Sequence, residues 1–525
     1  MPIVSGHGKN VGMAELKVLF ATSEVAPLIK TGGLADVSGA LPAALRAIGL
    51  DVRVLVPGYS RVMSQLVEHE VVANFDSVLS GFPPARLLAN KMANGVPVFV
   101  LDCPNFFQRT GGPYQDAGGR DWVDNALRFG LLSKTAAVLG SSASPLAWRP
   151  DVVHCNDWQT GLTPAYLHFA RQAAPSVMSI HNLAFQGVFP YSALEQLGLP
   201  PSCFSINGVE YYGNLSFLKA GLYYAEHLTT VSPNYAKEIQ STALGFGMQG
   251  LLTARRNDLT GILNGIDMME WNPATDRHLA MTYSIGQMAG KAANKQALQS
   301  RLGLDPEPDV PLLGVVSRFT QQKGLDVLLE IAPLLAKLPV QLAMLGSGNE
   351  EMQESAVDLS RRYPGRIGAV IGFDEALSHQ IEAGADMFAM PSRFEPCGLN
   401  QMYSQRYGTP PIVHATGGLA DSVVDCTEIA LNNRTASGFV FTGVTAINLF
   451  EAIQRAVEVY RSKRKWDALC DICMSKDFSW EGSADAYRKV YMRVLKDARN
   501  RQESAIPGVS GLAPSTTPKN SRGNI

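Results

Sequence analysis

Short apolar runs rich in β-branched residues recur along this chain of 525 residues, and they constrain its fold more than any other feature. Most are separated by stretches with helical spacing, such as LDVLLEIAPLLAKL at 325–338. Almost continuously hydrophobic strands that alternate with helices are typical of parallel sheets covered on both faces. The sequence therefore predicts an α/β protein. The runs lie at 16–22, 52–58, 96–102, 151–157, 176–182, 227–233, 312–319, 340–346, 367–373, 385–391 and 410–416.

The series of strands restarts near the middle of the chain. Residues 261–273 read as a strand and a turn, and a polar stretch and a proline-containing loop follow before the next run. A chain of this length suits two large domains. We therefore expect two doubly wound, Rossmann-like domains that face each other across a cleft. The expected divisions are an N-terminal extension at 1–15, a first domain at 16–265, a second domain at 266–475, a C-terminal helix at 476–497 that packs back on the first domain, and a disordered tail at 498–525.

Composition excludes several classes of function. The formal net charge of −2 provides no basic field for nucleic acid or membranes, and no apolar run is long enough to span a bilayer. The N-terminus does not read as a signal peptide, so we expect a cytoplasmic protein. The seven cysteines argue against a disulfide framework. Cys470 and Cys473 have C-x-x-C spacing, but no second pair completes a zinc site, and we interpret them as ordinary helix cysteines.

The phrase TGGLAD occurs twice, at 31–36 and at 416–421. The first copy lies downstream of the first predicted strand, and the second directly follows a strand of the second domain. Glycine lets backbone N–H groups approach a ligand closely, and a helix N-terminus favours anions. Either turn alone could be a plain helix entry. One turn in each domain favours a ligand held in the cleft, beyond the carboxyl ends of the strands.

Other polar side chains follow predicted strands. Arg318 and Lys323 come after one strand and suit a diphosphate, although two solvated surface cations would look the same. Glu395 follows another strand and could bind sugar hydroxyls or simply begin a helix. His181 ends a strand of the first domain, where a structural role is also common. The sequence contains no D-x-D motif, and the G-x-G-x-x-G at 245–250 follows a helical stretch, so we reject it as a dinucleotide site.

At these residues the chain resembles the bacterial glycogen synthases and plant starch synthases, which are retaining glucosyltransferases of the GT-B fold. The similarity runs from about residue 16 to residue 495, and the lysine-led K-T-G-G-L is the signature of this family. The matching segments are 30–37, 151–154, 181–184, 216–221, 263–267, 316–318, 322–324, 391–399 and 416–421.

The resemblance implies transfer of glucose from ADP-glucose to the 4-hydroxyl at the non-reducing end of an α-1,4-glucan such as glycogen. It implies retention of configuration, no cofactor and no metal. Arg318 and Lys323 would neutralise the leaving diphosphate, the backbone carbonyl of His181 would face the developing positive charge, and Glu395 would bind glucose hydroxyls. The expected substrate-binding residues are Lys30, Gly32, Gly33, Asp36, Tyr114, Asp157, Asn182, Asn264, Cys397, Gly398, Leu399, Asn400, Thr416, Gly417 and Gly418.

Three positions depart from the family pattern. Gln159 stands where the family usually has His, Gln249 where it has Glu, and Asn400 where it commonly has Thr or Ser. Two alternatives therefore stay open: a GT-B glucosyltransferase that uses UDP-glucose or another acceptor, and a catalytically silent glucan-binding paralogue. An active enzyme is favoured because the charged set is complete. This set is Lys30, His181, Arg318, Lys323 and Glu395.

Overall fold

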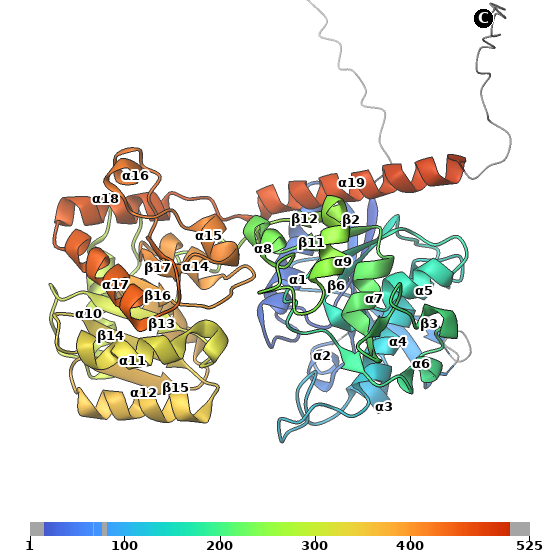
Figure 1. Cartoon of the computed structure of the whole chain (residues 1–525), viewed down its shortest axis with the longest axis horizontal. Helices are drawn as coiled ribbons and strands as arrows, with labels where there is room; N and C mark the ends of the chain where they lie inside the picture. The colour runs from blue at the N-terminus through green and yellow to red at the C-terminus, as the bar shows by residue number, and fades with distance from the viewer. Residues whose placement is uncertain (1–14, 67, 76–80, 505–525) are drawn as a thin grey trace, which may run out of the picture.

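The computed structural model describes residues 15–66, 68–75 and 81–504. Figure 1 shows two lobes side by side, with one long helix lying along the lobe that contains the start of the described chain. We call residues 15–262 together with this helix the N-terminal lobe, and residues 271–475 the C-terminal lobe. The N-terminal extension, except for residue 15, and most of the expected tail lie outside the described residues.

The N-terminal lobe is built on a nine-stranded sheet with the order β12-β11-β7-β6-β1-β2-β5-β4-β3. Its parallel strands are β1 (Lys17–Ala21), β2 (Asp51–Pro57), β5 (Pro97–Asp102), β6 (Val152–Asn156), β7 (Ser176–Ile180), β11 (His227–Thr230) and β12 (Leu259–Gly261). The expected strands of the first domain are all present. The helices are α1 (Gly33–Ala47), α2 (Ser60–Met63), α3 (Pro104–Phe107), α4 (Asn125–Leu139), α5 (Thr163–Phe169), α6 (Ala193–Gln196), α7 (Phe217–Tyr224), α8 (Pro233–Glu238) and α9 (Gln249–Ala254).

One edge of this sheet departs from the expected parallel pattern. Strands β3 (Glu70–Phe75) and β4 (Ala85–Lys91) run antiparallel, and β4 pairs antiparallel with β5. The turn between β4 and β5 is too short for a crossover helix, so the two strands must form a hairpin. Asn94 and Gly95 lie in this turn and are a recognisable hairpin signal. A second sheet of three short strands comprises β8 (Val188–Phe189), β10 (Asn214–Ser216) and β9 (Glu210–Tyr211).

The C-terminal lobe contains a parallel six-stranded sheet with the order β15-β14-β13-β16-β17-β18. Its strands are β13 (Leu312–Val316), β14 (Gln341–Gly346), β15 (Ile367–Ile371), β16 (Met387–Met390), β17 (Pro411–His414) and β18 (Phe439–Phe441). The helices are α10 (Ala289–Leu302), α11 (Leu325–Leu335), α12 (Glu350–Arg362), α13 (Glu375–Gly384), α14 (Asn400–Arg406), α15 (Gly417–Ser422), α16 (Glu428–Asn432), α17 (Ala446–Tyr460) and α18 (Lys463–Met474). This is the strand order of doubly wound nucleotide-binding sheets, and its direction reverses between β13 and β16.

The chain crosses between the lobes in two adjacent segments. The strand expected within 261–273 is misplaced, because β12 ends at Gly261 and the following residues form a non-repetitive connection. The returning segment lies beside it, and the backbone N–H of Ile266 donates to the carbonyl of Phe478 at 2.8 Å. Gly265 packs against the backbone of Ser479 and Trp480. A β-carbon at this glycine would meet that backbone, which explains why the crossing needs glycine.

After the second crossing, helix α19 (Trp480–Ser504) packs against α1 and β7. Tyr487, Val490 and Tyr491 are buried in the core of the N-terminal lobe. The helix continues seven residues beyond the expected end at 497, so the boundary of the tail was wrong. Residues 498–504 include arginine, glutamine and glutamate, which have good helix propensity and extend a helix that is already docked. In the parts of the chain that the structure describes, no helix is long and apolar enough to cross a membrane.

His154 joins α19 to the sheet and makes stability sensitive to acid. Its Nδ1 lies 2.8 Å from the Tyr491 hydroxyl and its Nε2 lies 2.6 Å from the Ser179 hydroxyl. Burial lowers the pKa of His154 from 6.5 to about 3. The unfolded chain therefore binds more protons between pH 6.5 and 3, and the free energy of unfolding falls as the pH is lowered through this window.

We expect His154→Gln to flatten this acid dependence. One buried neutral histidine contributes a slope of up to about 1.4 kcal/mol per pH unit. The free energy of unfolding, measured by denaturant titration between pH 6.5 and 4, should fall less steeply in the variant. The matched control is His69→Gln, because His69 is exposed. Equal slopes for the wild-type chain and His154→Gln would contradict this assignment.

Candidate active site

Two loops meet where the strand order of the C-terminal sheet reverses. One follows β13 and carries Arg318 and Lys323, and the other follows β16 and carries Glu395. The ammonium of Lys323 lies 2.5 Å from Oε2 of Glu395, and the hydroxyl of Ser392 donates to the same oxygen at 3.0 Å. Glu395 is 5 % exposed, whereas Arg318 is exposed. The site therefore combines a largely buried ion pair with an exposed guanidinium, which has no ion-pair partner among the described residues, at the carboxyl end of the strands.

The second TGGLAD copy packs against the backbone of the loop that carries Glu395. Thr416 is the N-cap of α15, and the N–H of Gly418 donates to the Glu395 carbonyl at 3.1 Å. Gly417 has φ of +43°, and a β-carbon there would lie 1.9 Å from the Glu395 carbonyl oxygen. A β-carbon at Gly418 would lie 2.0 Å from the Cys397 carbonyl oxygen. Both glycines are required by this close approach of two backbones.

In the N-terminal lobe, the first TGGLAD copy also begins a helix, because Gly32 is the N-cap of α1. Glu24 lies at the centre of the hydrogen bonds that this turn makes. Its carboxylate accepts from the Thr31 backbone N–H and hydroxyl, both at 2.5 Å, from the Gly32 N–H at 3.3 Å, and from the Tyr114 hydroxyl. By contrast, β-carbons at Gly32 and Gly33 would have no heavy atom within 4 Å. The first turn is therefore open where the second is closely packed.

Both turns bind a carboxylate of the N-terminal lobe. The first turn holds Glu24, and the second holds Glu238, which accepts from the Gly417 N–H at 2.9 Å and from the Thr416 hydroxyl at 3.1 Å. These contacts follow the general preference of a helix N-terminus for negative charge, and the role of the turns in binding a substrate stays a prediction. Sequence reasoning missed both partners. Glu24 follows β1 closely, so its position at a strand end was a usable signal, whereas Glu238 on α8 carried none.

His181 directly follows β7, which lies next to β6, and the strand order of the first sheet reverses between β6 and β1. Its backbone N–H donates to Oδ1 of Asp157 at 2.8 Å, and the N–H of Asn182 donates to the same oxygen at 3.4 Å. Its Nε2 lies 3.0 Å from the side-chain oxygen of Asn156. Burial lowers the pKa of His181 to about 4, and burial raises the pKa of Asp157 to about 7. The imidazole is therefore neutral at physiological pH and makes its contacts as a hydrogen-bonding group.

Helix α8 connects the His181 loop with the Glu395 loop. The N–H of Leu183 donates to the Tyr235 hydroxyl at 3.0 Å, and the hydroxyl of Ser232 donates to the Pro396 carbonyl at 2.7 Å. The rings of Phe246 and Phe394 also meet across the lobes, with centroids 5.7 Å apart. The walls of the candidate site are thus joined along one side by contacts between the lobes.

The comparisons with known proteins agree with this architecture. The starch synthase catalytic domain family matches residues 17–254, and the family of glycosyl transferases group 1 matches residues 300–468. A glycogen synthase of Nitrosomonas eutropha is 55 % identical over 489 residues, which cover 92 % of this chain and 97 % of that protein. A glycogen synthase of Nitrosospira multiformis is 56 % identical over 489 residues, covering 92 % and 98 % respectively.

The chain belongs to the glycogen and starch synthase family. Its fold is the two-domain GT-B fold of glycosyltransferases. The solved catalytic domain of starch synthase IV from Arabidopsis thaliana, bound to ADP and acarbose, matches with a TM-score of 0.80 and 31 % identity. It covers 92 % of this chain and the whole of that chain. The resemblance inferred from the motifs is confirmed.

The structure places Lys30, an expected substrate-binding residue, at the first glycine turn beside Asp36. Its ammonium pairs with Asp36 at 2.7 Å, and its side chain is half exposed. In the described structure, Lys30 forms no ion pair with a group of the C-terminal lobe. The Lys30–Asp36 pair therefore lies at the first glycine turn, separate from the Lys323–Glu395 pair.

Asn264 and the expected residues 397–400 gather around the start of α14. Burial raises the pKa of the Cys397 thiol to about 12, and the neighbouring Asn264 acts in the opposite direction. Gly398 has φ of +72°, and Leu399 is the N-cap of α14. The side-chain amide of Asn400 donates to the Val316 carbonyl at 2.8 Å and so ties α14 to the end of β13.

The three departures from the family pattern have different surroundings. Asn400 uses one amide hydrogen for Val316 and retains a second donor. Gln159 is buried, and the Oε1 atoms of Gln159 and Gln249 have no hydrogen-bond partner among the described residues. Gln249 begins α9. Of the three positions, Asn400 is therefore the one that contacts the end of β13, the strand that leads into the loop with Arg318.

Proposed function

We propose that the protein is a cytoplasmic glycogen synthase that transfers glucose from ADP-glucose to the non-reducing 4-hydroxyl of an α-1,4-glucan, with retention and without a catalytic metal. The observation that carries this proposal is the arrangement of Arg318, Lys323 and Glu395 at the reversal point of the C-terminal sheet. Ligands of doubly wound sheets bind at this point, and the cationic side chains there complement a diphosphate.

In the proposed reaction, the bond between glucose C1 and the diphosphate breaks, a bond between C1 and the acceptor oxygen forms, and the proton of the acceptor hydroxyl passes to the departing diphosphate. Arg318 and Lys323 stabilise the negative charge that develops on the departing ADP. Glu395 orients Lys323 and binds hydroxyls of the transferred glucose. His181 stays neutral because of its burial, so its loop adds no positive charge beside the developing oxocarbenium ion.

Two observations support the proposed donor. The related starch synthase IV domain binds ADP. In this chain, Phe373 is 85 % exposed and follows the carboxyl end of β15, where a flat aromatic ring can stack on a nucleobase. UDP-glucose is the second candidate, because a stacked ring does not by itself distinguish two bases.

The state of the cysteines supports the cytoplasmic location. All seven are free thiols, and six of them are buried. Thiols persist in a reducing compartment, whereas secreted proteins commonly pair theirs. Cys470 and Cys473 lie on α18 and are packed in the core of the C-terminal lobe.

The decisive experiment measures glucose incorporation into glycogen from ADP-glucose and from UDP-glucose, with and without EDTA. We expect transfer from ADP-glucose at an unchanged rate in EDTA. A preference for UDP-glucose would refute the proposed donor and would leave the assignment of the fold unchanged. Absence of transfer from either donor, in a folded protein, would favour the silent glucan-binding paralogue.

A further inference from the structure

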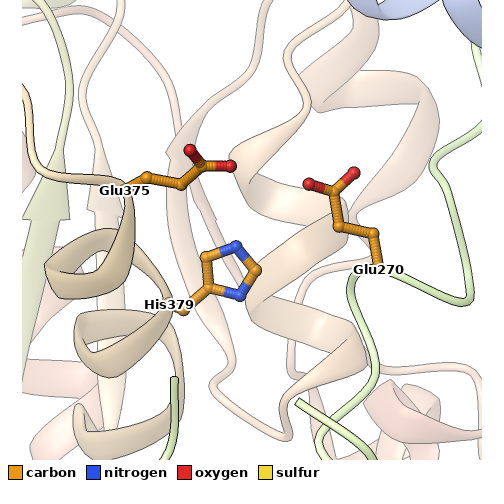
Figure 2. Close-up of side chains that lie close together, drawn as sticks. All are labelled: Glu270, Glu375 and His379. Carbon is orange, nitrogen blue, oxygen red and sulfur yellow. The ribbon is translucent and has the colours of Figure 1, made fainter. Parts of the chain in front are cut away.

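We propose that Glu270, Glu375 and His379 form a binding site for a divalent transition-metal cation, separate from the glucosyl-transfer chemistry. Glu270 belongs to the crossing between the lobes, and the other two residues belong to α13 of the C-terminal lobe. One ligand atom from each residue lies within 4.8 Å of those of the other two. Figure 2 shows the two carboxylates and the imidazole directed toward a common space.

Local structure places these side chains together. Glu375 and His379 are four residues apart on α13 and therefore share one face of the helix. Asp374 caps this helix by accepting from the Leu377 N–H at 2.8 Å. On the opposite side, the carboxylate of Asp267 accepts from the Glu270 N–H at 3.1 Å and fixes the backbone that carries the third residue.

His379 provides a second, independent indication of a ligand. It is only 2 % exposed, and its Nδ1 lies 2.7 Å from Oδ2 of Asp276. Its Nε2 is buried and has no hydrogen-bond partner among the described residues. In Figure 2 this nitrogen points to the space between the two carboxylates. A buried nitrogen without a partner is unfavourable, and a metal ion would satisfy it.

The surroundings of His379 are those of a metal-binding histidine. Such residues commonly place their other ring nitrogen against a carboxylate, which fixes the tautomer and the ring orientation. Asp276 does this here, and it also accepts from the Tyr407 hydroxyl at 2.5 Å. Trp271 stacks on the imidazole with centroids 3.9 Å apart and planes 9° apart. The ring is therefore held in place before any ion arrives.

Charge also favours a cation. Glu270 and Glu375 place two carboxylates beside one another, and neither forms a salt bridge in the described part of the chain. One imidazole nitrogen with two carboxylate oxygens suits Zn²⁺, Co²⁺ or Mn²⁺ better than Ca²⁺ or Mg²⁺. Zinc ligands lie about 2.0–2.2 Å from the ion in a tetrahedral arrangement, so any two ligand atoms are about 3.4 Å apart. Small rotations of the exposed glutamate side chains would provide this spacing.

A bound cation would connect the crossing between the lobes to α13. Two charged groups of the N-terminal lobe lie close enough to interact electrostatically with this cluster, Lys30 with Glu270 and Asp36 with Glu375. The proposed ion would therefore stabilise the connection beside the first glycine turn. This inference does not depend on the proposed donor or acceptor.

The test uses the full chain without a histidine tag, stripped of metal with EDTA and then exchanged into buffer without chelator. Calorimetric titration with Zn²⁺ should show one tight site, and Co²⁺ should give visible absorption bands typical of coordinated cobalt. Glu270→Gln and Glu375→Gln should each weaken Zn²⁺ binding at least about tenfold. Both residues are exposed, so the variants should fold. The matched control is Glu354→Gln, an exposed carboxylate on α12 that should leave binding unchanged.

Thermal unfolding provides an independent readout. Zn²⁺ should raise the Tm of the wild-type chain by several degrees but should hardly change that of Glu375→Gln, because only a bound ligand stabilises the folded state. Equal Zn²⁺ affinities in the wild type and both glutamate variants would overturn the proposal, as would the absence of binding. Loss of glucosyl transfer in EDTA would refute the metal-free chemistry, whereas the binding data decide this site on their own.

Discussion

Glu395→Ala is expected to lower glucosyl transfer by about 10²–10³-fold, which is the usual effect of removing one group that stabilises a transition state. The carboxylate is almost fully buried and contacts both Lys323 and Ser392. Its loss would leave the Lys323 ammonium without its partner and free to move away from the diphosphate. Steady-state kinetics with ADP-glucose and glycogen would measure the effect on kcat and KM.

Stability measurements separate a catalytic role of Glu395 from a structural one. Glu395→Gln keeps an oxygen that can accept from Ser392, so its Tm should stay closer to that of the wild type than the Tm of Glu395→Ala. Transfer should nevertheless remain low, because the amide cannot balance the charge of Lys323. Glu330→Ala, which removes an exposed carboxylate on α11, is the control and should be fully active. Near-normal turnover in folded Glu395→Ala would contradict a catalytic role for this residue.

The two TGGLAD turns should respond in opposite ways to alanine. Gly418→Ala would place a β-carbon 2.0 Å from the Cys397 carbonyl oxygen. The backbone of the Glu395 loop would have to move, so we expect a loss of about 3 kcal/mol in the free energy of unfolding together with most of the activity. Gly33→Ala places its β-carbon in open space at the start of α1. This variant should be as stable as the wild type or gain up to about 1 kcal/mol.

Activity then tests whether the first turn approaches the donor. If it does, the methyl group of Gly33→Ala should lower kcat/KM without lowering the Tm. Full activity would show that the donor does not come close to Gly33. A wild-type Tm for Gly418→Ala would contradict the close packing of the second turn. Thermal unfolding and kinetics of both variants, prepared in parallel, distinguish these outcomes.

Much of the fold could be predicted because its signals are local. Each predicted β-branched run of the two domains contains a strand, and both glycine turns begin helices, as the order of apolar and small residues indicated. The family motifs also identified the loops that follow β13 and β16. The roles assigned to the individual residues in these loops stay predictions, which the variants above test.

The sequence by itself determined the alternation of strands and helices, because that pattern depends on neighbouring residues and on which faces are apolar. Only the tertiary structure decided which carboxylates fill the two turns. Glu24 lies within eight residues of its turn, whereas Glu238 is 179 residues from Gly417. The tertiary structure also placed Glu270 near the buried nitrogen of His379. Contacts of this kind arise from the packing of one lobe or segment on another, and nothing in the local order of residues specifies them.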